Sequence, residues 1–338
     1  MSLVYIIAEA GVNHNGDILL AYELIDEAKK AGADAVKFQT FKAENLASIN
    51  AEMADYQKKN LIKEQSQFEM LKSLQIEYED FYKLKHYCEE NEIEFLSTPF
   101  DIDSLNFLVD ELGVEKIKIP SGEIINHPFL KEVAKKNKDT ILSTGMSNLS
   151  EIEEAINIFE EEEKFNKEVL ILHCTTNYPT PYNEVNLNAM LTIKSAFKRS
   201  VGYSDHTLGI EVPIAATALG AKIIEKHFTL DKNMKGPDHK ASLEPIELRK
   251  MIKSIRNIEY SLGNGIKKAN ESELRIMNEV RKSLVINRSM KKGEKIQESD
   301  LSTKRPSKGI SPKYFDLVVG RELKENIVAE TLLTWDLI

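Results

Sequence analysis

The chain alternates short apolar segments of strand length with amphipathic segments of helix length, eight times over. The expected strands lie at residues 5–8, 35–38, 94–96, 116–119, 140–142, 169–172, 201–203 and 222–224. Neighbouring parallel strands need a long crossover, usually a helix, so this alternation predicts a parallel sheet covered by helices. Eight such units within about 260 residues match the size of an α/β fold of the TIM (β/α)8 barrel type.

A doubly wound nucleotide-binding sheet is the alternative fold. No GxGxxG follows any expected strand, and no GxxxxGK[ST] occurs in the chain. Gly11 and Gly16 stand at the spacing of a phosphate-binding loop, but Asp17 occupies the position where the lysine should be. The sequence therefore favours the barrel.

Beyond the last barrel helix the sequence changes character. We place the barrel domain at residues 1–265, a charged helical linker at 266–282 and a small domain at 283–338. Two stretches of the small domain, 290–301 and 323–337, resemble each other, which indicates an internal two-fold repeat.

One long segment interrupts the strand–helix repeat. Residues 42–75 are polar, carry few strand or helix signals of their own, and follow the second expected strand. That position lies at the end of the barrel where active sites form, so we expect the segment to shape a site rather than the scaffold.

The net charge and the cysteines argue against several classes of protein. A formal charge of −9 disfavours nucleic acid as the main partner, although a local basic cluster can still bind a small anion. Cys88 and Cys174 lie outside any CxxC spacing, which fits a reduced, cytoplasmic environment. We expect no membrane span, since no apolar run approaches ~18 residues, and no signal peptide.

Polar residues follow the expected strands at their carboxyl ends. Lys37 and Lys118 sit within apolar runs, so we expect them to point into the barrel and bind a phosphate or carboxylate. Glu9 and Glu123 are candidate general acid/base groups, although Glu123 can equally cap the following helix. Hydroxyl, amide and charged groups at the other strand ends include Gln39, Thr98, Ser121, Ser143, Tyr178, Ser204, Asp205, Glu225 and Lys226.

His206 and His227 close two neighbouring strands that one helix-length segment separates. Parallel strands joined in this way share one mouth, so the two imidazoles can form half of a divalent-metal site; two satisfied core or surface histidines are the alternative. A metal beside an anion pocket would polarise a carbonyl oxygen, which indicates the joining of an anionic carbon nucleophile to an aldehyde. The sixth strand has no lysine, which counts against a Schiff-base aldolase without excluding Lys118.

Ten motifs in this chain resemble, in order, those of the bacterial sialic acid synthase family, which includes the legionaminic acid synthases. They are IAEAGVNHNG at 7–16, VKFQT at 36–40, LSTPF at 96–100, KIPSGE at 118–123, STGM at 143–146, YPTP at 178–181, GYSDH at 202–206, EKHFT at 225–229, GPD at 236–238 and KRP at 304–306. Together they span essentially the whole chain.

The resemblance implies a TIM barrel followed by a small antifreeze-like (SAF, β-clip) domain that swaps across a homodimer. It implies that His206 and His227 hold Mn²⁺ or Mg²⁺, and that Arg305 reaches the N-acyl group of the sugar. It also implies a phosphoenolpyruvate pocket of Lys37, Lys118, Ser121, Ser143, Ser204 and Thr98. Contacts with the sugar or the reacting centre are implied for Glu9, Gln39, Glu123, Tyr178 and Asp238. Asp238 and Arg305 rest on the resemblance alone.

The expected reaction is the synthesis of N-acetylneuraminate. Phosphoenolpyruvate would condense with N-acetylmannosamine and water, and phosphate would leave by C–O cleavage. One alternative is N,N'-diacetyllegionaminate synthase acting on 2,4-diacetamido-2,4,6-trideoxymannose, and another is a metal-dependent pyruvate aldolase, which releases no phosphate. Residues 181–185 and 236–242 do not distinguish the two sugars.

Overall fold

The computed structural model describes residues 3–48, 51, 53 and 66–338. The chain divides into two compact units, Met1–Gly263 and Asn264–Ile338. Each unit has a hydrophobic core of its own. The division falls close to residue 265, where the sequence places the end of the barrel.

Eight parallel strands form the barrel of the first unit, in the order β3-β2-β1-β8-β7-β6-β5-β4, and the barrel prediction is confirmed. Contacts between β3 and β4 complete the ring, with no hydrogen-bonded ladder between these two fully described strands. The strands are β1 (Tyr5–Gly11), β2 (Ala35–Thr40), β3 (Glu94–Pro99), β4 (Lys116–Ile119), β5 (Asp139–Ser143), β6 (Val169–Cys174), β7 (Val201–Asp205) and β8 (Ile223–His227).

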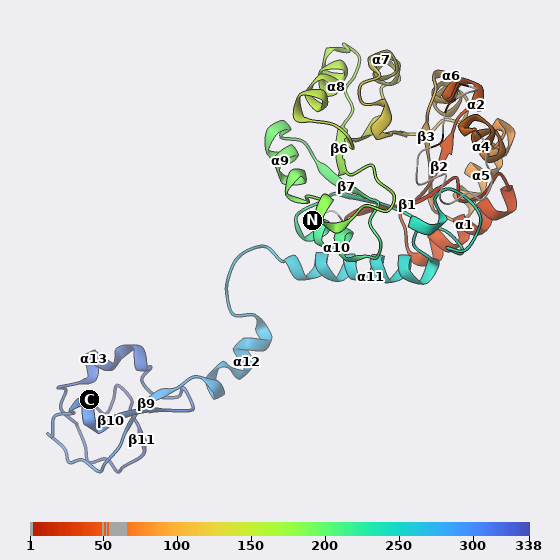
Figure 1. Ribbon diagram of the computed structural model, residues 1–338. Helices are drawn as coiled ribbons and strands as arrows, with labels where there is room; N and C mark the ends of the chain where they lie inside the picture. The colour runs from red at the N-terminus through yellow and green to blue at the C-terminus, as the bar shows by residue number, and fades with distance from the viewer. Residues whose placement is uncertain (1–2, 49–50, 52, 54–65) are drawn as a thin grey trace. The chain divides into compact units, whose positions relative to one another are not determined.

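Helices surround these strands on the outside (Figure 1). Their buried faces form the larger core against the sheet. The helical segment after β3 is divided into α6 (Ile102–Asn106) and a π-helical turn, η1 (Phe107–Glu111). The others are α1 (Ile18–Ala31), α5 (Tyr78–Glu90), α7 (His127–Lys135), α8 (Leu149–Glu161), α9 (Asn188–Phe197), α10 (Glu211–Ala218) and α11 (Pro245–Leu262).

The interior of the barrel is built in two chemically different layers. One buried cluster inside the ring is apolar and consists of Ile7, Ala35, Leu96, Ile141, Leu172 and Ile223. Side chains two residues further along a strand point to the same face, and these are Glu9, Lys37, Thr98, Ser143, Cys174 and Glu225. The barrel interior therefore has a polar layer at the mouth and an apolar layer beneath it.

Segment 42–75 differs from the sequence-based expectation, because its described part contains two helices. They are α2 (Ala43–Leu46) and α4 (Gln67–Leu74), and α4 begins with a capping box between Ser66 and Glu69. That box, followed by Met70, Leu71 and Leu74 at helical spacing, is the signal that predicts α4. Residues 49–50, 52 and 54–65 of the segment lie outside the described residues.

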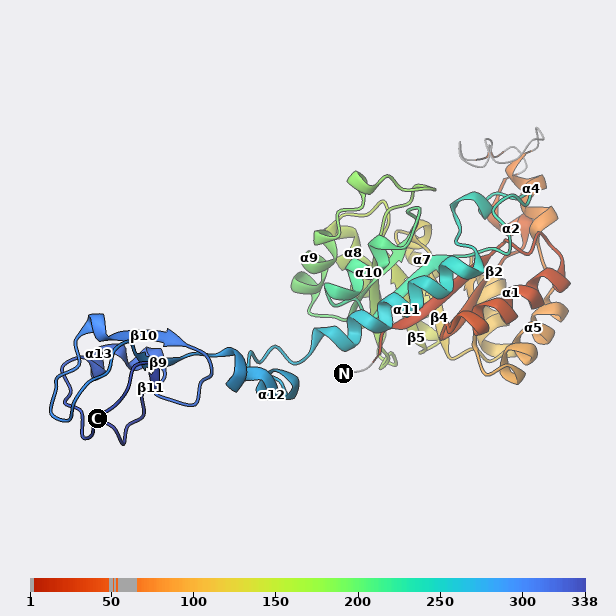
Figure 2. The same cartoon turned by 90° about the horizontal axis from the view of Figure 1, so that it is seen from below.

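The second unit contains α12 (Glu271–Val280), α13 (Phe315–Val318) and a small antiparallel sheet. The sheet has the order β10-β9-β11, formed by β9 (Ser283–Ile286), β10 (Leu301–Lys304) and β11 (Thr331–Leu332), and Figure 2 shows these strands side by side. Isolated bridges pair Met290 with Ile327 and Lys295 with Glu322, so the two self-similar stretches contact each other. None of the described helices, in either unit, combines the length and the apolar character that a membrane span requires.

Candidate active site

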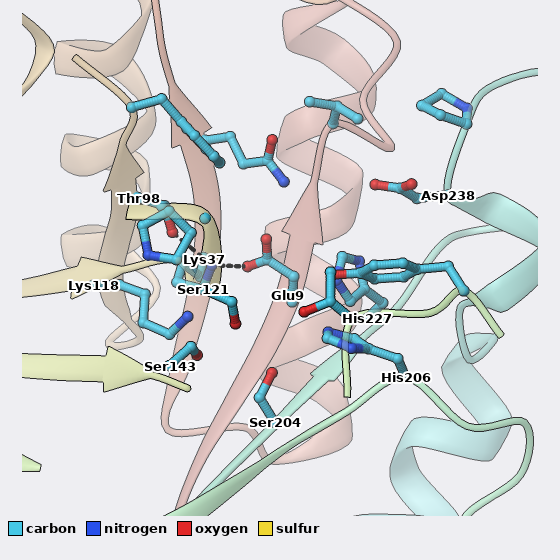
Figure 3. Close-up of a pocket in the computed structure, with 18 of the residues that line it drawn as sticks. Glu9, Lys37, Thr98, Lys118, Ser121, Ser143, Ser204, His206, His227 and Asp238 are labelled. Carbon is cyan, nitrogen blue, oxygen red and sulfur yellow. Dashed lines mark hydrogen bonds and ion pairs between the residues drawn. The ribbon is translucent and has the colours of Figure 1, made fainter. Parts of the chain in front are cut away.

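A cavity of about 570 Å³ opens at the carboxyl ends of the barrel strands. Figure 3 shows Lys37 and Lys118 on one side of it, His206 and His227 on the other, and Glu9 between them. The cavity is lined by nearly all the predicted site residues, namely Glu9, Lys37, Gln39, Thr98, Lys118, Ser121, Ser143, Tyr178, Ser204, His206, His227 and Asp238.

Two lysines and two glutamates form the charged centre of the cavity, and each is at most 4% exposed. Lys37 Nζ lies 2.6 Å from Glu9 Oε2 and 3.7 Å from Glu225 Oε2, and Lys118 Nζ lies 3.4 Å from Glu225 Oε1. The sheet register explains the first contact, because Glu9 pairs with Lys37 on β2 and with His227 on β8. Registered residues of parallel strands point to the same face, so all three side chains converge inside the barrel.

The two carboxyl groups of this centre have opposite pKa shifts. Burial raises the pKa of Glu9 to about 7 and outweighs the attraction of Lys37. Burial would also raise the pKa of Glu225, but the ammonium groups of Lys118 and Lys37 outweigh it and hold that pKa at about 2. Glu225 therefore stays ionised, whereas Glu9 can gain or lose a proton near neutral pH.

The lysines respond to the same neighbours. Burial alone would lower the pKa of Lys37, but the carboxylates of Glu225 and Glu9 outweigh it and raise that pKa. For Lys118, burial dominates over the attraction of Glu225, and the pKa is lowered. Two lysines facing two glutamates leave this centre with no surplus positive charge when all four groups are ionised.

Hydroxyl groups surround the charged centre. Ser204 Oγ donates to Glu225 Oε1 over 2.8 Å, and Lys37 donates to Thr98 Oγ1 over 2.8 Å. Ser121 Oγ accepts a hydrogen bond from the backbone N–H of Gly145. The buried hydroxyl of Ser143 has no hydrogen-bond partner among the described residues, so it is available to a ligand.

His206 and His227 lie beside this centre with ring centroids 5.5 Å apart. Burial lowers the pKa of both imidazoles, and the positive charge that a protonated His206 would carry lowers the pKa of His227 further. Both rings are therefore neutral at pH 7. The carbonyl of Thr175 lies 2.6 Å from His206 Nδ1, which fixes that nitrogen as the hydrogen-bond donor and leaves Nε2 with a free lone pair.

These two residues fit a divalent metal. Nδ1 of His227 is buried and has no hydrogen-bond partner among the described residues, as expected for a nitrogen reserved for a ligand. Neutral imidazoles are the form that binds Mn²⁺ or similar ions. The described residues contain no cluster of three or more His, Cys, Asp or Glu side chains able to hold a metal. Two protein ligands leave open coordination positions for water or substrate.

The remaining walls of the cavity combine an aromatic ring, an acid and an apolar face. Tyr178 lies over His206 with ring centroids 4.1 Å apart. Burial raises the pKa of Asp238 to about 6. The helices α2 and α4 contribute an apolar wall of Leu46, Met70, Leu71 and Leu74, so segment 42–75 does line the cavity.

Glu123 belongs to the predicted site but does not line the cavity, whereas Glu225 lines the cavity and is absent from the predicted site. Glu123 ends the 3₁₀ turn η2 (Ser121–Glu123), and its Oε2 accepts a hydrogen bond from Asn126 over 2.6 Å. Arg305 is exposed and belongs to the second unit. Glu225 stands at a strand end, and the sequence pattern alone assigns it no role. Its place two residues before His227 in β8 was the available signal, because the two side chains must share a face.

The fold and the cavity define a TIM-barrel protein with a polar active-site-like cavity and a small C-terminal domain. Residues 24–267 match the NeuB family and residues 281–338 match the SAF domain. The chain belongs to the NeuB family, as its motifs had indicated.

The curated relatives of the chain include N,N'-diacetyllegionaminic acid synthases. The one from Campylobacter jejuni subsp. jejuni serotype O:2 is 52% identical over 98% of this chain and 99% of its own length. The one from Legionella pneumophila subsp. pneumophila is 48% identical over 98% of this chain and 94% of its own length. A crystal structure of N-acetylneuraminic acid (sialic acid) synthetase from Leptospira borgpetersenii, in complex with citrate, is 38% identical with a TM-score of 0.71. The match covers 81% of this chain and 90% of that one.

Proposed function

We propose that this enzyme is an N,N'-diacetyllegionaminate synthase, which condenses phosphoenolpyruvate with 2,4-diacetamido-2,4,6-trideoxymannose and water and releases phosphate. This reverses the order of the sequence-based expectation, which put N-acetylneuraminate first. The names of the relatives at 52% and 48% identity support the choice of sugar. The observation that carries the reaction type is the meeting of two buried lysines and two neutral imidazoles in one cavity.

The lysine side of the cavity suits phosphoenolpyruvate. Lys37 and Lys118 would bind its phosphate and carboxylate, with the hydroxyl groups of Ser121 and Ser143 as further donors. The hydroxyl of Ser204, which donates to Glu225, lies on the same side of the cavity. Since Glu9 and Glu225 already occupy the two ammonium groups, the anion replaces a carboxylate as a neighbour of Lys37. Glu9, whose pKa is raised to about 7, is the carboxyl that can accept a proton when this happens.

The imidazole side suits the aldehyde of the open-chain sugar. His206 and His227 would hold Mn²⁺ or Mg²⁺, and a bound ion of this kind supplies Lewis-acid polarisation of a carbonyl oxygen. Thr175 fixes the His206 tautomer, and Tyr178 covers the His206 ring. The sugar would thus be held with its reactive carbon facing the lysine side, where phosphoenolpyruvate would bind.

Glu9 lies between the two sides and is the residue placed for proton transfer (Figure 3). C3 of phosphoenolpyruvate would attack the aldehyde carbon, and water would add at C2. The tetrahedral intermediate then expels phosphate. Glu9 in its protonated form can donate to the oxygen that develops negative charge, and in its ionised form it can accept the proton of the added water. Glu123 is assigned no such step, because it does not line the cavity.

Phosphate release tests the function directly. Phosphoenolpyruvate is supplied with either the 6-deoxy diacetamido sugar or N-acetylmannosamine, with and without EDTA. The proposal expects faster release with the former and loss of release in EDTA. Preference for N-acetylmannosamine would support an N-acetylneuraminate synthase, a candidate that the 38% identity to the Leptospira synthetase favours. Carbon–carbon bond formation from pyruvate without phosphate release would support an aldolase.

We also propose a homodimer in which the C-terminal domain of one subunit closes the cavity of the other. The exposed Arg305 would then contact the N-acyl group of the sugar. Arg305→Ala should raise the KM for the sugar, and an effect confined to phosphoenolpyruvate would contradict the proposal. Mixing Arg305→Ala with Lys37→Met subunits should restore part of the activity, because one kind of mixed site is then intact. The metal identity and a cytoplasmic location stay predictions.

A further inference from the structure

A third buried lysine lies next to the active site but takes no part in the proposed reaction. Lys226 stands between Glu225 and His227 on β8, so its side chain points to the opposite face of the strand. Its side chain is 0% exposed and does not line the cavity. Burying an ammonium group is costly unless strong partners compensate, so its contacts require an explanation.

Lys226 is held by two acceptors at the end of the neighbouring strand. Its Nζ lies 2.5 Å from Asp205 Oδ2 and also donates to the backbone carbonyl of Thr207. Asp205 Oδ1 in turn accepts from the N–H of Thr207 over 3.1 Å and from its hydroxyl over 2.9 Å. Lys226, Asp205 and Thr207 are all fully buried, and we call these three residues the clamp.

The clamp encloses His206, which lies between Asp205 and Thr207 in the chain. The backbone ladder of β7 and β8 reaches its last register pair at Asp205 and Lys226. Beyond that pair, the contact from Lys226 to the Thr207 carbonyl continues the connection to β8, one residue before His227. Lys226 therefore joins the strand that carries one imidazole to the turn that carries the other.

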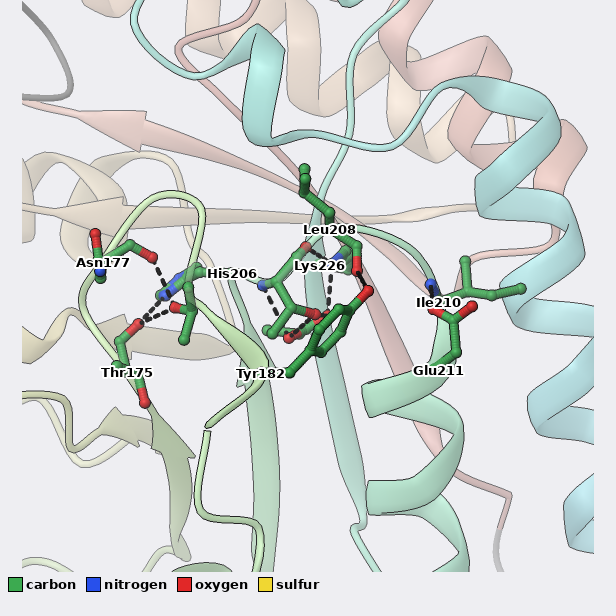
Figure 4. Close-up of polar contacts among 11 residues, drawn as sticks. Thr175, Asn177, Tyr182, His206, Leu208, Ile210, Glu211 and Lys226 are labelled. Atoms are coloured by element: carbon green, nitrogen blue, oxygen red, sulfur yellow. Dashed lines mark hydrogen bonds and ion pairs between the residues drawn. The ribbon is translucent and has the colours of Figure 1, made fainter. Parts of the chain in front are cut away.

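Contacts from the segment that follows β6 also support this turn (Figure 4). The carbonyl of Thr175 lies at His206 Nδ1, and the hydroxyl of Tyr182 donates to the carbonyl of Leu208 over 2.9 Å. These contacts come from the segment after β6, whereas Lys226 of the clamp comes from β8. The turn that carries His206 is thus held by two segments of the chain, and one of them, β8, also carries His227.

We propose that Lys226 is a positioning residue that sets the spacing of His206 and His227 and thereby the affinity of the enzyme for its divalent cation. The inference rests on the metal role proposed above. Lysine suits this task because its ammonium group supplies three donors to a carboxylate and a carbonyl in fixed places. A residue of similar length without donors would leave both acceptors unmatched.

The test uses a variant that removes the clamp without leaving a buried charge. Lys226→Met alone leaves the Asp205 carboxylate buried without its cation, which can prevent folding. The double variant Lys226→Met/Asp205→Asn is therefore used. The introduced amide keeps an oxygen for the two donors of Thr207. The control is Lys116→Met/Glu94→Gln, since Lys116 and Glu94 form a 2.6 Å, partly exposed ion pair between β4 and β3 outside the cavity.

Titration of the full-length enzyme with Mn²⁺, followed by the EPR signal of free Mn²⁺, measures the predicted effect. Removing outer support of metal-binding histidines costs about 10- to 100-fold in affinity, and we expect a loss in this range for the double variant and none for the control. Phosphoenolpyruvate binding in EDTA, measured by calorimetry, should stay unchanged in both. A double variant that binds Mn²⁺ like the wild type would overturn the proposal. So would an equal loss of phosphoenolpyruvate binding, which indicates general damage.

A metal-free measurement separates this inference from the metal role itself. In EDTA, ¹⁵N-histidine NMR should detect the buried Nδ1–H of His206 in the wild type and the control, and show faster exchange of that proton in the double variant. Wild-type enzyme that binds no Mn²⁺ would refute the proposed metal role, while this signal still decides whether Lys226 positions the ring. An unchanged signal in the double variant would overturn the positioning role.

Discussion

Two buried lysine–carboxylate clusters lie on opposite faces of β8 and differ in how completely their polar groups are matched. On the outer face, Lys226 and Asp205 are fully buried. They form an ion pair with each other, and Asp205 also accepts a hydrogen bond from the Thr207 hydroxyl. On the inner face, Glu225 Oε2 and the hydroxyl of Ser143 have no hydrogen-bond partner among the described residues. Burial is similar in the two clusters, so burial does not separate structural from functional charges. The unmatched groups Glu225 Oε2 and Ser143 Oγ both line the cavity, where a ligand can complete them.

The largest effect should come from breaking the outer cluster on one side only. Lys226→Met leaves the Asp205 carboxylate buried without a cation, which should lower the free energy of unfolding by about 3–5 kcal/mol. Urea unfolding in EDTA measures this loss. A variant as stable as the wild type would show that the outer pair is not needed to hold the fold, and the comparison would fail.

Breaking the inner cluster should affect activity more than stability. Lys37→Met removes a cation aimed at the substrate anion and should lower kcat/KM by about 10²- to 10³-fold. Its free energy of unfolding should fall less than that of Lys226→Met, because Glu9 can take up a proton when its cation is removed. Phosphate-release kinetics and urea unfolding on the same samples provide both values. A loss of stability equal to that of Lys226→Met would show that the inner and outer clusters do not differ in this respect.

The pH dependence of stability sharpens the comparison further. The pKa of Glu9 is raised from 4.5 to about 7 in the native state, so the native state holds this proton more tightly than the unfolded chain. Stability contributed by this group is therefore present below pH 4.5 and is lost as pH rises through about 7. Glu9→Gln removes this contribution, so its Tm relative to the wild type should rise across that interval. Parallel Tm curves in EDTA would contradict the raised pKa.

The smallest effect should come from Glu123, which belongs to neither cluster. Its carboxylate accepts from Asn126 and does not line the cavity, so Glu123→Gln should leave kcat and both KM values close to those of the wild type. Steady-state kinetics with both substrates checks this. A large fall in kcat would mean that η2 rearranges to bring Glu123 into the cavity during the reaction.

Much of the fold was predictable because each strand and helix has a strong local period. The polar layer of the mouth was predictable for the same reason, since Glu9, Lys37 and Ser143 occupy strand positions that alternate with apolar ones. Glu225 follows the same alternation. It is identified only when alternate residues of the strand end are assigned to opposite faces.

The sequence was less informative where the backbone leaves the strand. Glu123 lies two residues after Ser121 in a 3₁₀ turn, where about three residues complete one turn and the two side chains diverge. The helix α4 was missed because its signals lie within a mostly polar segment. Arg305 lies in the second unit, and no local pattern in the sequence relates that unit to the barrel.

The equal numbers of lysines and glutamates in the mouth have a consequence for solution thermodynamics. In the proposed binding mode, an incoming anion would replace Glu9 as the neighbour of Lys37, and Glu9 would then favour its neutral form. Binding of the anion would thereby be linked to uptake of a proton from the solution. The heat measured on binding would therefore include the ionisation enthalpy of the buffer that supplies the proton.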